Sequence, residues 1–362
     1  MANHKSKYYM RLALQQAETV IGNTATNPAV GCVVVRDGNV ISAGSTSKNG
    51  RPHAEDNAIK FSKSKVLNSE IYTTLEPCSN YGKTTPCVKK IAKNKIKKVF
   101  FAMNDPDIKS FKKSKSFFNK KNINVHSGIL LNKVTDFYRS YNKQKLDNLP
   151  FVSAKIAQSK DYLTNNKKDK WITNMYSRGR VHLIRSFHDC ILTTCKTIKA
   201  DNPTLNCRIK GLENNSPTRF IIDKDLNIPL NSKIIKTAKK YKTFLFYNKF
   251  KRKKIKYLKN FKIKLISVSL NYDGGFNLSE ILYQIKELGF SRVLLEAGLN
   301  MTSKFLDQNL IDDFYIFISG KRLGKNGNNS FLKCYNYYLK NKRCLKEKIN
   351  LFDDSLYIYR IK

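Results

Sequence analysis

Apolar positions in the first half of the chain follow two different periods. Residues 5–20 carry apolar side chains at helical spacing, which predicts one amphipathic helix. Residues 31–35 and 40–43 are short apolar runs that flank Asp37 and Gly38, a sequence typical of a β-hairpin. Strands that alternate with helices of this length predict an α/β sheet covered by helices. The remaining predicted elements of this half are a helix from His53, a strand at 71–74, a helix after Cys87 and a strand at 98–102.

A polar stretch that ends at Pro150 separates this half from a second one. We place a domain boundary there and predict domains of residues 1–147 and 148–362. A chain of 362 residues is long enough for two domains that each bury a core. The second domain repeats the alternation, and its last strand alternates like the edge of a sheet. Its predicted helices are 176–187 and 279–288, and its predicted strands are 151–156, 190–193, 220–223, 243–247, 264–268, 292–295, 314–318 and 356–361.

The charge of the chain is strongly positive. There are 68 Lys and Arg residues against 27 Asp and Glu, which gives a formal net charge of +41. Such a balance is typical of proteins that bind nucleic acid or an anionic surface. Most of the cations are lysines spread over both halves, which indicates a compositional bias, and the cluster at 251–256 is interpreted as a solvated face. We therefore expect no specific nucleic-acid partner, although a nucleic-acid deaminase or binding protein stays open as an alternative. Positive potential also favours phosphorylated substrates.

The cysteines and the hydropathy of the chain indicate the cellular compartment in which the protein is expected. The eight cysteines show no disulfide-framework spacing, which favours a reducing interior. The charged start of the chain is followed by no apolar signal core. No apolar run approaches the roughly 18 residues that span a bilayer. We expect a cytoplasmic protein with no membrane partner.

The candidate chemistry lies between His53 and Cys87. The chain has His-Ala-Glu at 53–55 and then Glu-Pro-Cys at 76–78, which resembles the H-x-E and P-C-x-x-C signature of zinc deaminases. A catalytic Zn²⁺ takes three protein ligands and keeps its fourth position for water, whose pKa falls to about 7. His53, Cys78 and Cys87 are the predicted ligands, and they are expected at helix N-termini. Glu55 is the predicted catalytic proton carrier, so the reaction is hydrolytic deamination.

The spacing of the two cysteines departs from that signature. Cys87 comes nine positions after Cys78, so a loop that contains Tyr81, Gly82 and Lys83 is inserted at the mouth of the site. Polynucleotide and cytidine deaminases have the short spacing, and this departure therefore favours a different substrate class.

Two segments of the second domain have the composition of ligand-binding loops. Residues 197–208 form a polar loop, interrupted by proline, that carries Asp201 and Arg208. At 294–300 a buried strand ends in Glu296, and Gly298 lets a helix begin close to an anionic group such as a pyrophosphate. No G-x-G-x-x-G motif accompanies them, which disfavours a Rossmann dehydrogenase.

Motifs along nearly the whole chain resemble one known family. They are NPAVGCVVV at 27–35, PHAE at 52–55, TLEPCSNYGKTTPC at 74–87, NDP at 104–106, WIT at 171–173, TIKADNPTL at 197–205 and LEAG at 295–298. The chain resembles the bifunctional riboflavin-biosynthesis proteins, in which a diaminohydroxyphosphoribosylaminopyrimidine deaminase is fused to a 5-amino-6-(5-phosphoribosylamino)uracil reductase. The stretched cysteine spacing is itself a mark of that family.

The resemblance implies a fold, two cofactors and a substrate. A cytidine-deaminase-like domain would bind Zn²⁺, and a dihydrofolate-reductase-like domain would use NADPH. The substrate would be a small phosphorylated pyrimidine ribotide, deaminated in the first domain and then reduced from ribosyl to ribityl in the second. A homo-oligomer, either a dimer or a tetramer, is also expected from the resemblance alone.

The resemblance also implies further site residues. In the first domain Asn27, Asn80 and Lys83 would contact substrate, with Lys83 placed to meet the phosphate. In the second domain the cofactor would be bound by Ala157, Trp171, Thr197, Asp201, Lys224 and Gly298, and the substrate by Asp169, Arg185, Leu205, Arg208 and Glu296. Arg185 and Arg208 suit phosphate because a guanidinium offers a bidentate fork.

Three positions depart from the family pattern. Asn80 stands where family members usually have His, and another usual His is absent near Thr46. The usual Ser-Leu-Asp-Gly is here Ser-Lys-Asp-Tyr at 159–162, so Tyr162 replaces a turn glycine at a cost of about 1 kcal/mol or more if φ is positive. A protein of the same fold in which only the deaminase is active is therefore a second alternative.

Overall fold

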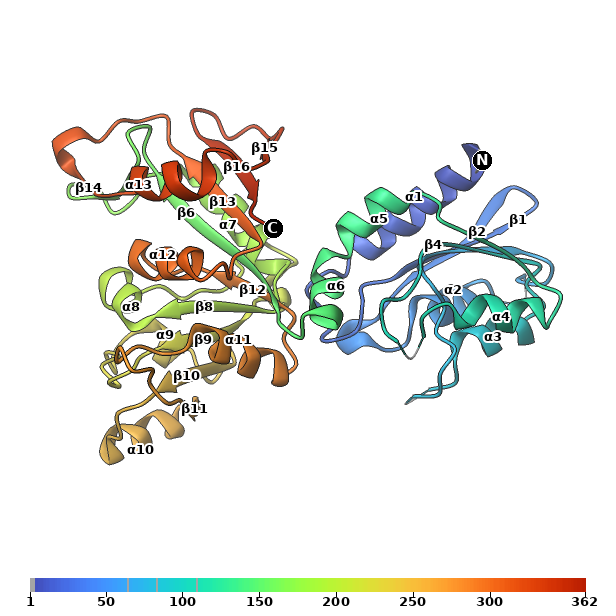
Figure 1. Cartoon of the computed structure of the whole chain (residues 1–362), viewed down its shortest axis with the longest axis horizontal. Coiled ribbons are helices and arrows are strands. Elements are labelled where there is room, and N and C mark those ends of the chain that lie inside the picture. The colour runs from blue at the N-terminus through green and yellow to red at the C-terminus, as the bar shows by residue number, and fades with distance from the viewer. Residues whose placement is uncertain (1–3, 64, 83, 109) are drawn as a thin grey trace. The chain divides into compact units, whose positions relative to one another are not determined.

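The structure, a computed structural model, describes residues 4–63, 65–82, 84–108 and 110–362. The chain divides into two compact units, Met1–Leu149 and Pro150–Lys362, which Figure 1 colours from blue to green and from green to red. In the described part of the chain, no helix is both long and apolar enough to cross a membrane.

The first unit is built on a five-stranded sheet with the order β2-β1-β3-β4-β5. The strands are β1 (Gly31–Arg36), β2 (Asn39–Ser45), β3 (Glu70–Leu75), β4 (Lys98–Met103) and β5 (Asn124–Ser127). The predicted hairpin is confirmed, because β1 and β2 pair antiparallel around Asp37 and Gly38. β3, β4 and β5 run parallel to one another, and stacked rings of Tyr72 and Phe100 join β3 to β4.

Helices cover both faces of this sheet, with α1 and α5 on one side and α2, α3 and α4 on the other (Figure 1). The helices are α1 (His4–Glu18), α2 (Ala54–Phe61), α3 (Cys87–Lys93), α4 (Lys113–Asn119), α5 (Leu131–Phe137) and α6 (Arg139–Leu146), with a short 3-10 turn η1 (Lys48–Gly50). Glycine lets two of them lie against strands. A Cβ on Gly31 would stand 1.8 Å from the Ala13 carbonyl oxygen, and one on Gly44 would stand 2.6 Å from that of Ala54. The close approach at Gly44 fixes the start of α2, where the metal motif begins.

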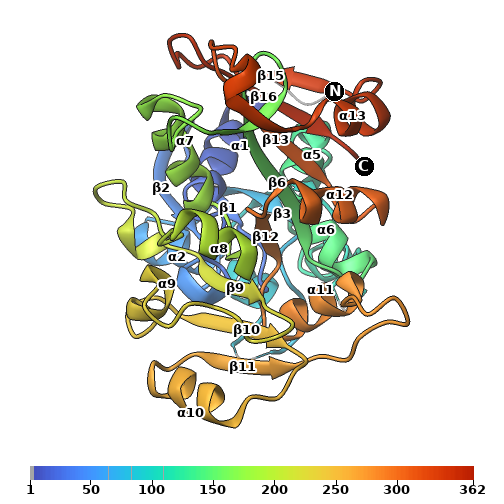
Figure 2. The same ribbon diagram turned by 90° about the vertical axis from the view of Figure 1, so that its left-hand side faces the viewer.

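The second unit contains a nine-stranded sheet with the order β11-β10-β9-β8-β12-β6-β13-β16-β15. Its strands are β6 (Phe151–Gln158), β8 (Cys190–Thr194), β9 (Thr218–Ile222), β10 (Thr243–Tyr247), β11 (Lys264–Ser267), β12 (Arg292–Leu295), β13 (Asp313–Ile318), β15 (Cys344–Lys346) and β16 (Ser355–Arg360), and β7 (Leu163–Asn166) pairs separately with β14 (Gly327–Ser330). Strands from β11 to β13 are parallel, and Figure 2 shows β9, β10 and β11 side by side. Parallel strands with buried apolar residues on both faces are typical of α/β folds.

Most helices of the second unit lie, along the chain, between successive parallel strands. The helices are α7 (Met175–Ser186), α8 (Cys195–Asp201), α9 (Lys233–Lys236), α10 (Arg252–Asn260), α11 (Leu278–Glu287), α12 (Leu299–Asp307) and α13 (Leu332–Cys334), with short turns η2 (Glu213–Asn215), η3 (Gly324–Asn326) and η4 (Tyr335–Leu339). The predicted α/β class is confirmed in both units.

One strand prediction was wrong. β16 was expected at the edge of its sheet, but it lies between β13 and β15. The true edge strand, β15, has three exposed residues and no apolar alternation, so the pattern gave no sign of it.

Candidate functional site

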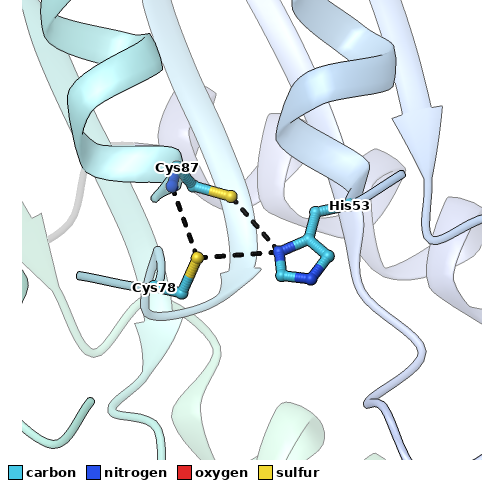
Figure 3. A group of neighbouring side chains, drawn as sticks. All are labelled: His53, Cys78 and Cys87. Carbon is cyan, nitrogen blue, oxygen red and sulfur yellow. Dashed lines mark hydrogen bonds between the residues drawn. The ribbon is translucent and has the colours of Figure 1, made fainter. Parts of the chain in front are cut away.

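Three side chains of the first unit converge on one point. His53 precedes the first residue of α2, and Cys87 is the first residue of α3, as expected for ligands at helix N-termini. That expectation was wrong for Cys78, which lies in the loop after β3. Their ligand atoms all lie within 4.8 Å of one another. The His53 Nδ1 atom is 3.3 Å from Cys87 Sγ and 3.6 Å from Cys78 Sγ (Figure 3). A tetrahedral zinc with bonds of about 2.0 Å to nitrogen and 2.3 Å to sulfur separates its ligand atoms by roughly 3.5 Å. The arrangement therefore fits the ion.

The chemistry of the donors also fits a metal. The hydrogen bond with Cys87 and that with His53 lower the pKa of Cys78 to about 4, although burial raises it. The backbone N–H of Cys87 also donates to Cys78 Sγ at 3.3 Å. The pKa of the Cys87 thiol is raised by its bond to Cys78 and by burial. The lowered pKa of Cys78 favours its thiolate, which is the form that binds zinc.

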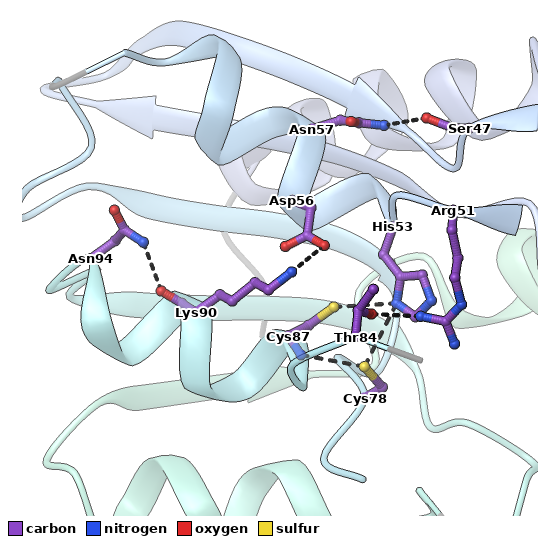
Figure 4. A network of polar contacts seen from close by, with 10 residues as sticks. All are labelled: Ser47, Arg51, His53, Asp56, Asn57, Cys78, Thr84, Cys87, Lys90 and Asn94. Atoms are coloured by element: carbon purple, nitrogen blue, oxygen red, sulfur yellow. Dashed lines mark hydrogen bonds and ion pairs between the residues drawn. The ribbon is translucent and has the colours of Figure 1, made fainter. Parts of the chain in front are cut away.

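The spacing between the two helices that carry the ligands is held by an ion pair. Lys90 of α3 lies 2.5 Å from the Asp56 carboxylate of α2 (Figure 4). On the other side of α2, Asn57 donates to the Ser47 hydroxyl and the Ser45 carbonyl. These contacts fix α2 to both of its neighbours, and so fix His53 relative to Cys87.

Glu55 lies in the first turn of α2 with a relative exposure of 4%. Burial raises the pKa of its carboxyl group to about 7, against the opposing charge of His53. A carboxyl group with a pKa near neutrality can both take up and release a proton. It is not a member of the ligand triad.

These residues open into a pocket with a volume of about 280 Å³. The space suits a small ring compound. Asn27 and Asn80, both predicted to contact substrate, line the pocket with Glu55. Tyr81 and Gly82 from the inserted loop also line it, and Lys83 lies outside the described residues.

Thr46 has a structural contact in place of the missing imidazole. Its hydroxyl accepts from the Val30 N–H at 2.9 Å and donates to the Pro28 carbonyl at 3.0 Å. Thr46 therefore holds the segment that follows Asn27.

Sequence reasoning gave no role to Glu76. Its buried carboxylate accepts hydrogen bonds from the backbone N–H groups of Asp105 and Lys112, and from both the N–H and the hydroxyl of Ser114. It thus anchors the segment that supplies Asp105 and Asp107 to the pocket wall. The available signal was a glutamate next to Pro-Cys at the end of a buried strand.

In the second unit the structure joins Arg185 of α7 to Glu296 after β12. The pair is bidentate, with Arg185 Nε 2.7 Å from Oε1 and Nη2 2.9 Å from Oε2. Burial alone would raise the pKa of Glu296, but the charge and hydrogen bonds of Arg185 hold it at about 2. The remaining Arg185 nitrogen, Nη1, donates to the Asn206 carbonyl.

Two further residues belong to this cluster. Lys155 of β6 lies close enough to interact with Glu296, Arg185 and Asp201, and burial lowers its pKa. Sequence reasoning missed it, although a lysine inside an apolar strand was the available signal. The charge of Arg208 contributes to the low pKa of His182, which falls to about 4 through burial and the charges of Arg185 and Arg208.

Leu205, a predicted substrate contact, has a left-handed backbone with φ of 55°. The Asn206 carbonyl after it accepts from Arg185 and is bonded to His182 Nδ1 at 2.9 Å. Strained backbone of this kind persists where surrounding contacts hold it, often at functional sites.

Thr197 and Gly298 form a second predicted group. The Gly298 N–H, at the start of α12, donates to the Thr197 hydroxyl at 3.2 Å. A Cβ on Gly298 would come no closer than 4.0 Å to that hydroxyl, so the N-terminus of α12 is open to an anionic group.

The other predicted cofactor and substrate residues are more dispersed. Trp171 is 55% exposed and lies beside the Arg178 guanidinium. Lys224 donates to the Gly274 carbonyl, and Ala157 is partly buried on β6. Within the described residues, no hydrogen bond or ion pair joins Asp169, Trp171 or Lys224 to the Arg185 cluster.

The turn with the missing glycine is formed by Tyr162 itself, at a φ of 63°. The positive φ considered from the sequence is confirmed. The neighbouring Asp161 holds the loop, because its carboxylate accepts from the Ser159 hydroxyl and from the N–H groups of Leu323 and Gly324.

Comparisons with known proteins cover both units. Residues 150–342 match the family model of the RibD C-terminal domain, and residues 3–103 match that of the cytidine and deoxycytidylate deaminase zinc-binding region. The riboflavin biosynthesis protein RibD of Aquifex aeolicus is 31% identical over 90% of this chain and 90% of its own. The solved structure of Acinetobacter baumannii RibD has a TM-score of 0.86 at 26% identity, and covers 99% of both chains. A deaminase/reductase from Thermotoga maritima has a TM-score of 0.84 at 26% identity, again over 99% of both chains.

Proposed function

We propose that this chain, which belongs to the RibD family of riboflavin-biosynthesis proteins, uses the His53–Cys78–Cys87 centre for deamination and the Arg185–Glu296 cluster for reduction. The chain is a bifunctional zinc-dependent deaminase and NADPH-dependent reductase. Its first unit has the cytidine-deaminase-like fold and its second the dihydrofolate-reductase-like fold of that family, as the sequence predicted. The substrate is a small pyrimidine ribotide, which we take to be the diaminopyrimidine that gives the Thermotoga relative its name.

For the deaminase, we assign His53, Cys78 and Cys87 to zinc and Glu55 to proton transfer. Zinc, when bound, supplies a Lewis acid that lowers the pKa of a water molecule. Glu55 would hold the proton removed from the attacking water and pass it to the amine nitrogen, as the carbon–oxygen bond forms and the carbon–nitrogen bond breaks. A carboxyl pKa near 7 suits both transfers. Asn27 and Asn80 orient the ring with their amide groups. We retain Lys83 as a phosphate contact on the resemblance alone.

For the reductase, NADPH supplies a hydride when bound. The open N-terminus of α12 at Gly298, beside the Thr197 hydroxyl, supports binding of an anionic part of that cofactor. Asp201, Ala157, Trp171 and Lys224 remain proposed cofactor contacts, and Asp169 and Leu205 proposed substrate contacts, by resemblance.

Arg185 and Arg208 have different proposed roles. Three nitrogens of Arg185 already donate to Glu296 and Asn206, so this side chain is proposed to position Glu296. Arg208 is exposed, and is proposed as the fork that binds the substrate phosphate. Glu296, held ionised, would accept hydrogen bonds from substrate hydroxyl groups.

The observation that carries the deaminase assignment is the convergence of three ligand atoms within 4.8 Å beside a buried glutamate. The test is to assay the two half-reactions separately on protein of measured metal content. We expect about one zinc per chain, release of ammonia from the diaminopyrimidine ribotide, and NADPH oxidation with the deaminated product. Metal-free protein that deaminates at the full rate would contradict the assignment. NADPH oxidation that cannot be detected would support the deaminase-only alternative. A homo-oligomer is proposed by resemblance, and light scattering on the purified chain tests it.

A further inference from the structure

The deaminase pocket contains several acidic groups. Glu55, Glu76, Asp105 and Asp107 all line it. Asp107 is paired with Lys145, so the other three carboxyl groups are the ones that disfavour a phosphate, and a cation at the mouth would offset them. The pocket therefore needs a positive group close to where the phosphate enters.

Two cations other than the metal ligand His53 line the pocket in the described part of the chain. Lys145 is paired with Asp107 at 2.7 Å, so its charge is compensated. Arg51 donates from Nη1 to the Thr84 hydroxyl at 2.6 Å (Figure 4), and no carboxylate partner for it is found among the described residues. Of the two lining cations among the described residues, Arg51 is thus the one whose charge has no carboxylate partner.

The position of Arg51 suits the entrance of the pocket. It is partly buried, and it precedes His53 by two residues, whereas Gly82 and Thr84 of the inserted loop are exposed. A Cβ on Gly82 would lie 3.3 Å from Arg51 Nη2, so the guanidinium rests against that loop. One of its five N–H donors is used by Thr84, and the others can form a bidentate contact with a phosphate.

We propose that Arg51 is a specificity-determining residue of the deaminase, which binds the phosphate of the ribotide substrate at the pocket mouth and does not take part in the chemistry. This inference rests on the proposed function. The contact is between the guanidinium and a phosphate monoester, held in place by the Thr84 hydroxyl.

The test compares the pyrimidine ribotide with its dephosphorylated riboside as substrates of the full-length zinc enzyme. Arg51→Gln is expected to raise KM for the ribotide by roughly tenfold or more, because a charge-assisted contact is lost. The kcat for the ribotide and the kcat/KM for the riboside should each change less than about twofold, since the chemistry is untouched. Arg51→Lys should give an intermediate KM, because it keeps the charge without the fork.

Ribose 5-phosphate as a competitive inhibitor provides a second readout. Its inhibition constant should rise in Arg51→Gln by about the same factor as the KM of the ribotide. The matched control is Arg36→Gln, which removes an exposed arginine of the same unit that lies near Asp37 and away from the pocket lining. It should leave the KM of the ribotide unchanged.

Two results would overturn the inference. One is that Arg51→Gln lowers kcat/KM equally for the ribotide and the riboside. The other is that the ribotide KM and the ribose 5-phosphate inhibition constant both stay at their wild-type values. Wild-type enzyme with no activity on the ribotide would instead contradict the proposed function, so the two failures are distinguishable. Zinc content measured for each variant shows whether the metal centre has formed.

Discussion

Replacing Glu296 by glutamine tests the electrostatics of the reductase cluster. The change keeps the shape of the side chain but removes the negative charge that faces Arg185 and Lys155. Both cations would then remain in a site where the Arg185 side chain is only 11% exposed. A buried charge that loses its partner is strongly destabilising.

The magnitude follows from the pKa of Glu296. Its fall from 4.5 to about 2 corresponds to about 3 kcal/mol of preference for the ionised form. Breaking a buried ion pair by removing one partner typically costs 3–5 kcal/mol, roughly the same size. We therefore expect Glu296→Gln to lower the free energy of unfolding of the second unit by about 3 kcal/mol at pH 7.

The sign of the pH dependence follows from the same shift. A carboxyl group whose pKa is lower in the folded state stabilises the protein above its unfolded pKa of 4.5, and the contribution is lost as pH falls toward 2. The difference between wild type and Glu296→Gln should therefore shrink below pH 4.5.

The assay is urea unfolding followed by tryptophan fluorescence. Trp171 is the single tryptophan of the chain and lies in the second unit, so its signal reports on that unit. Glu287→Gln, which removes an exposed carboxylate paired only with Lys286, is the matched control and should cost less than about 1 kcal/mol. Adding Lys155→Met to Glu296→Gln should recover part of the loss, because one uncompensated cation is removed. A Glu296→Gln variant as stable as the control would refute this reasoning.

Three further outcomes are expected. Glu55→Gln should reduce ammonia release by roughly 10²- to 10⁴-fold while zinc content stays near one per chain; full activity would exclude Glu55 as the proton carrier. Removing zinc with a chelator should lower the unfolding temperature of the first unit by circular dichroism and leave the Trp171 transition unchanged, and a shift in both would contradict a metal confined to that unit. Burial holds the pKa of His182 at about 4 and that of His188 at about 3, so both stay neutral in the folded state while the unfolded chain takes up protons. The second unit should therefore lose about 2 kcal/mol through His188 between pH 6.5 and 5, and less through the less deeply buried His182, so His188→Gln should reduce the loss.

Much of the fold could be predicted because the apolar runs in the sequence correspond to strands that are buried in the structure. The hairpin around Gly38 and the strand at 292–295 are confirmed, because β1 and β12 are apolar runs that are buried almost throughout and the Asp-Gly turn fixes the partner of β1. Short polar elements could not be found this way. β7 and β15 contain few apolar residues. The partners of β7 are more than 160 positions away, and those of β15 are 11 to 15 positions away.

The metal motif could be predicted because its ligands have distinctive chemistry and lie close together in sequence. Lys155 and Glu76 could not, because each acts through residues that are distant along the chain. Lys155 gains its role from Glu296 and Arg185, and Glu76 from the backbone of Asp105 and Ser114. The ion pair between Arg185 and Glu296 could not be predicted either, because only the folded sheet brings these two distant residues together.

The dependence of NADPH oxidation on deamination tests the bifunctional account most directly. Wild-type enzyme given the diaminopyrimidine ribotide and NADPH should release ammonia first and oxidise NADPH afterwards. Glu55→Gln should do neither with that substrate, yet oxidise NADPH at the wild-type rate when given the deaminated product, because the second unit is unchanged. The account would be contradicted if Glu55→Gln oxidised NADPH when given the diaminopyrimidine ribotide. It would also be contradicted if the wild-type enzyme oxidised no NADPH when given the deaminated product.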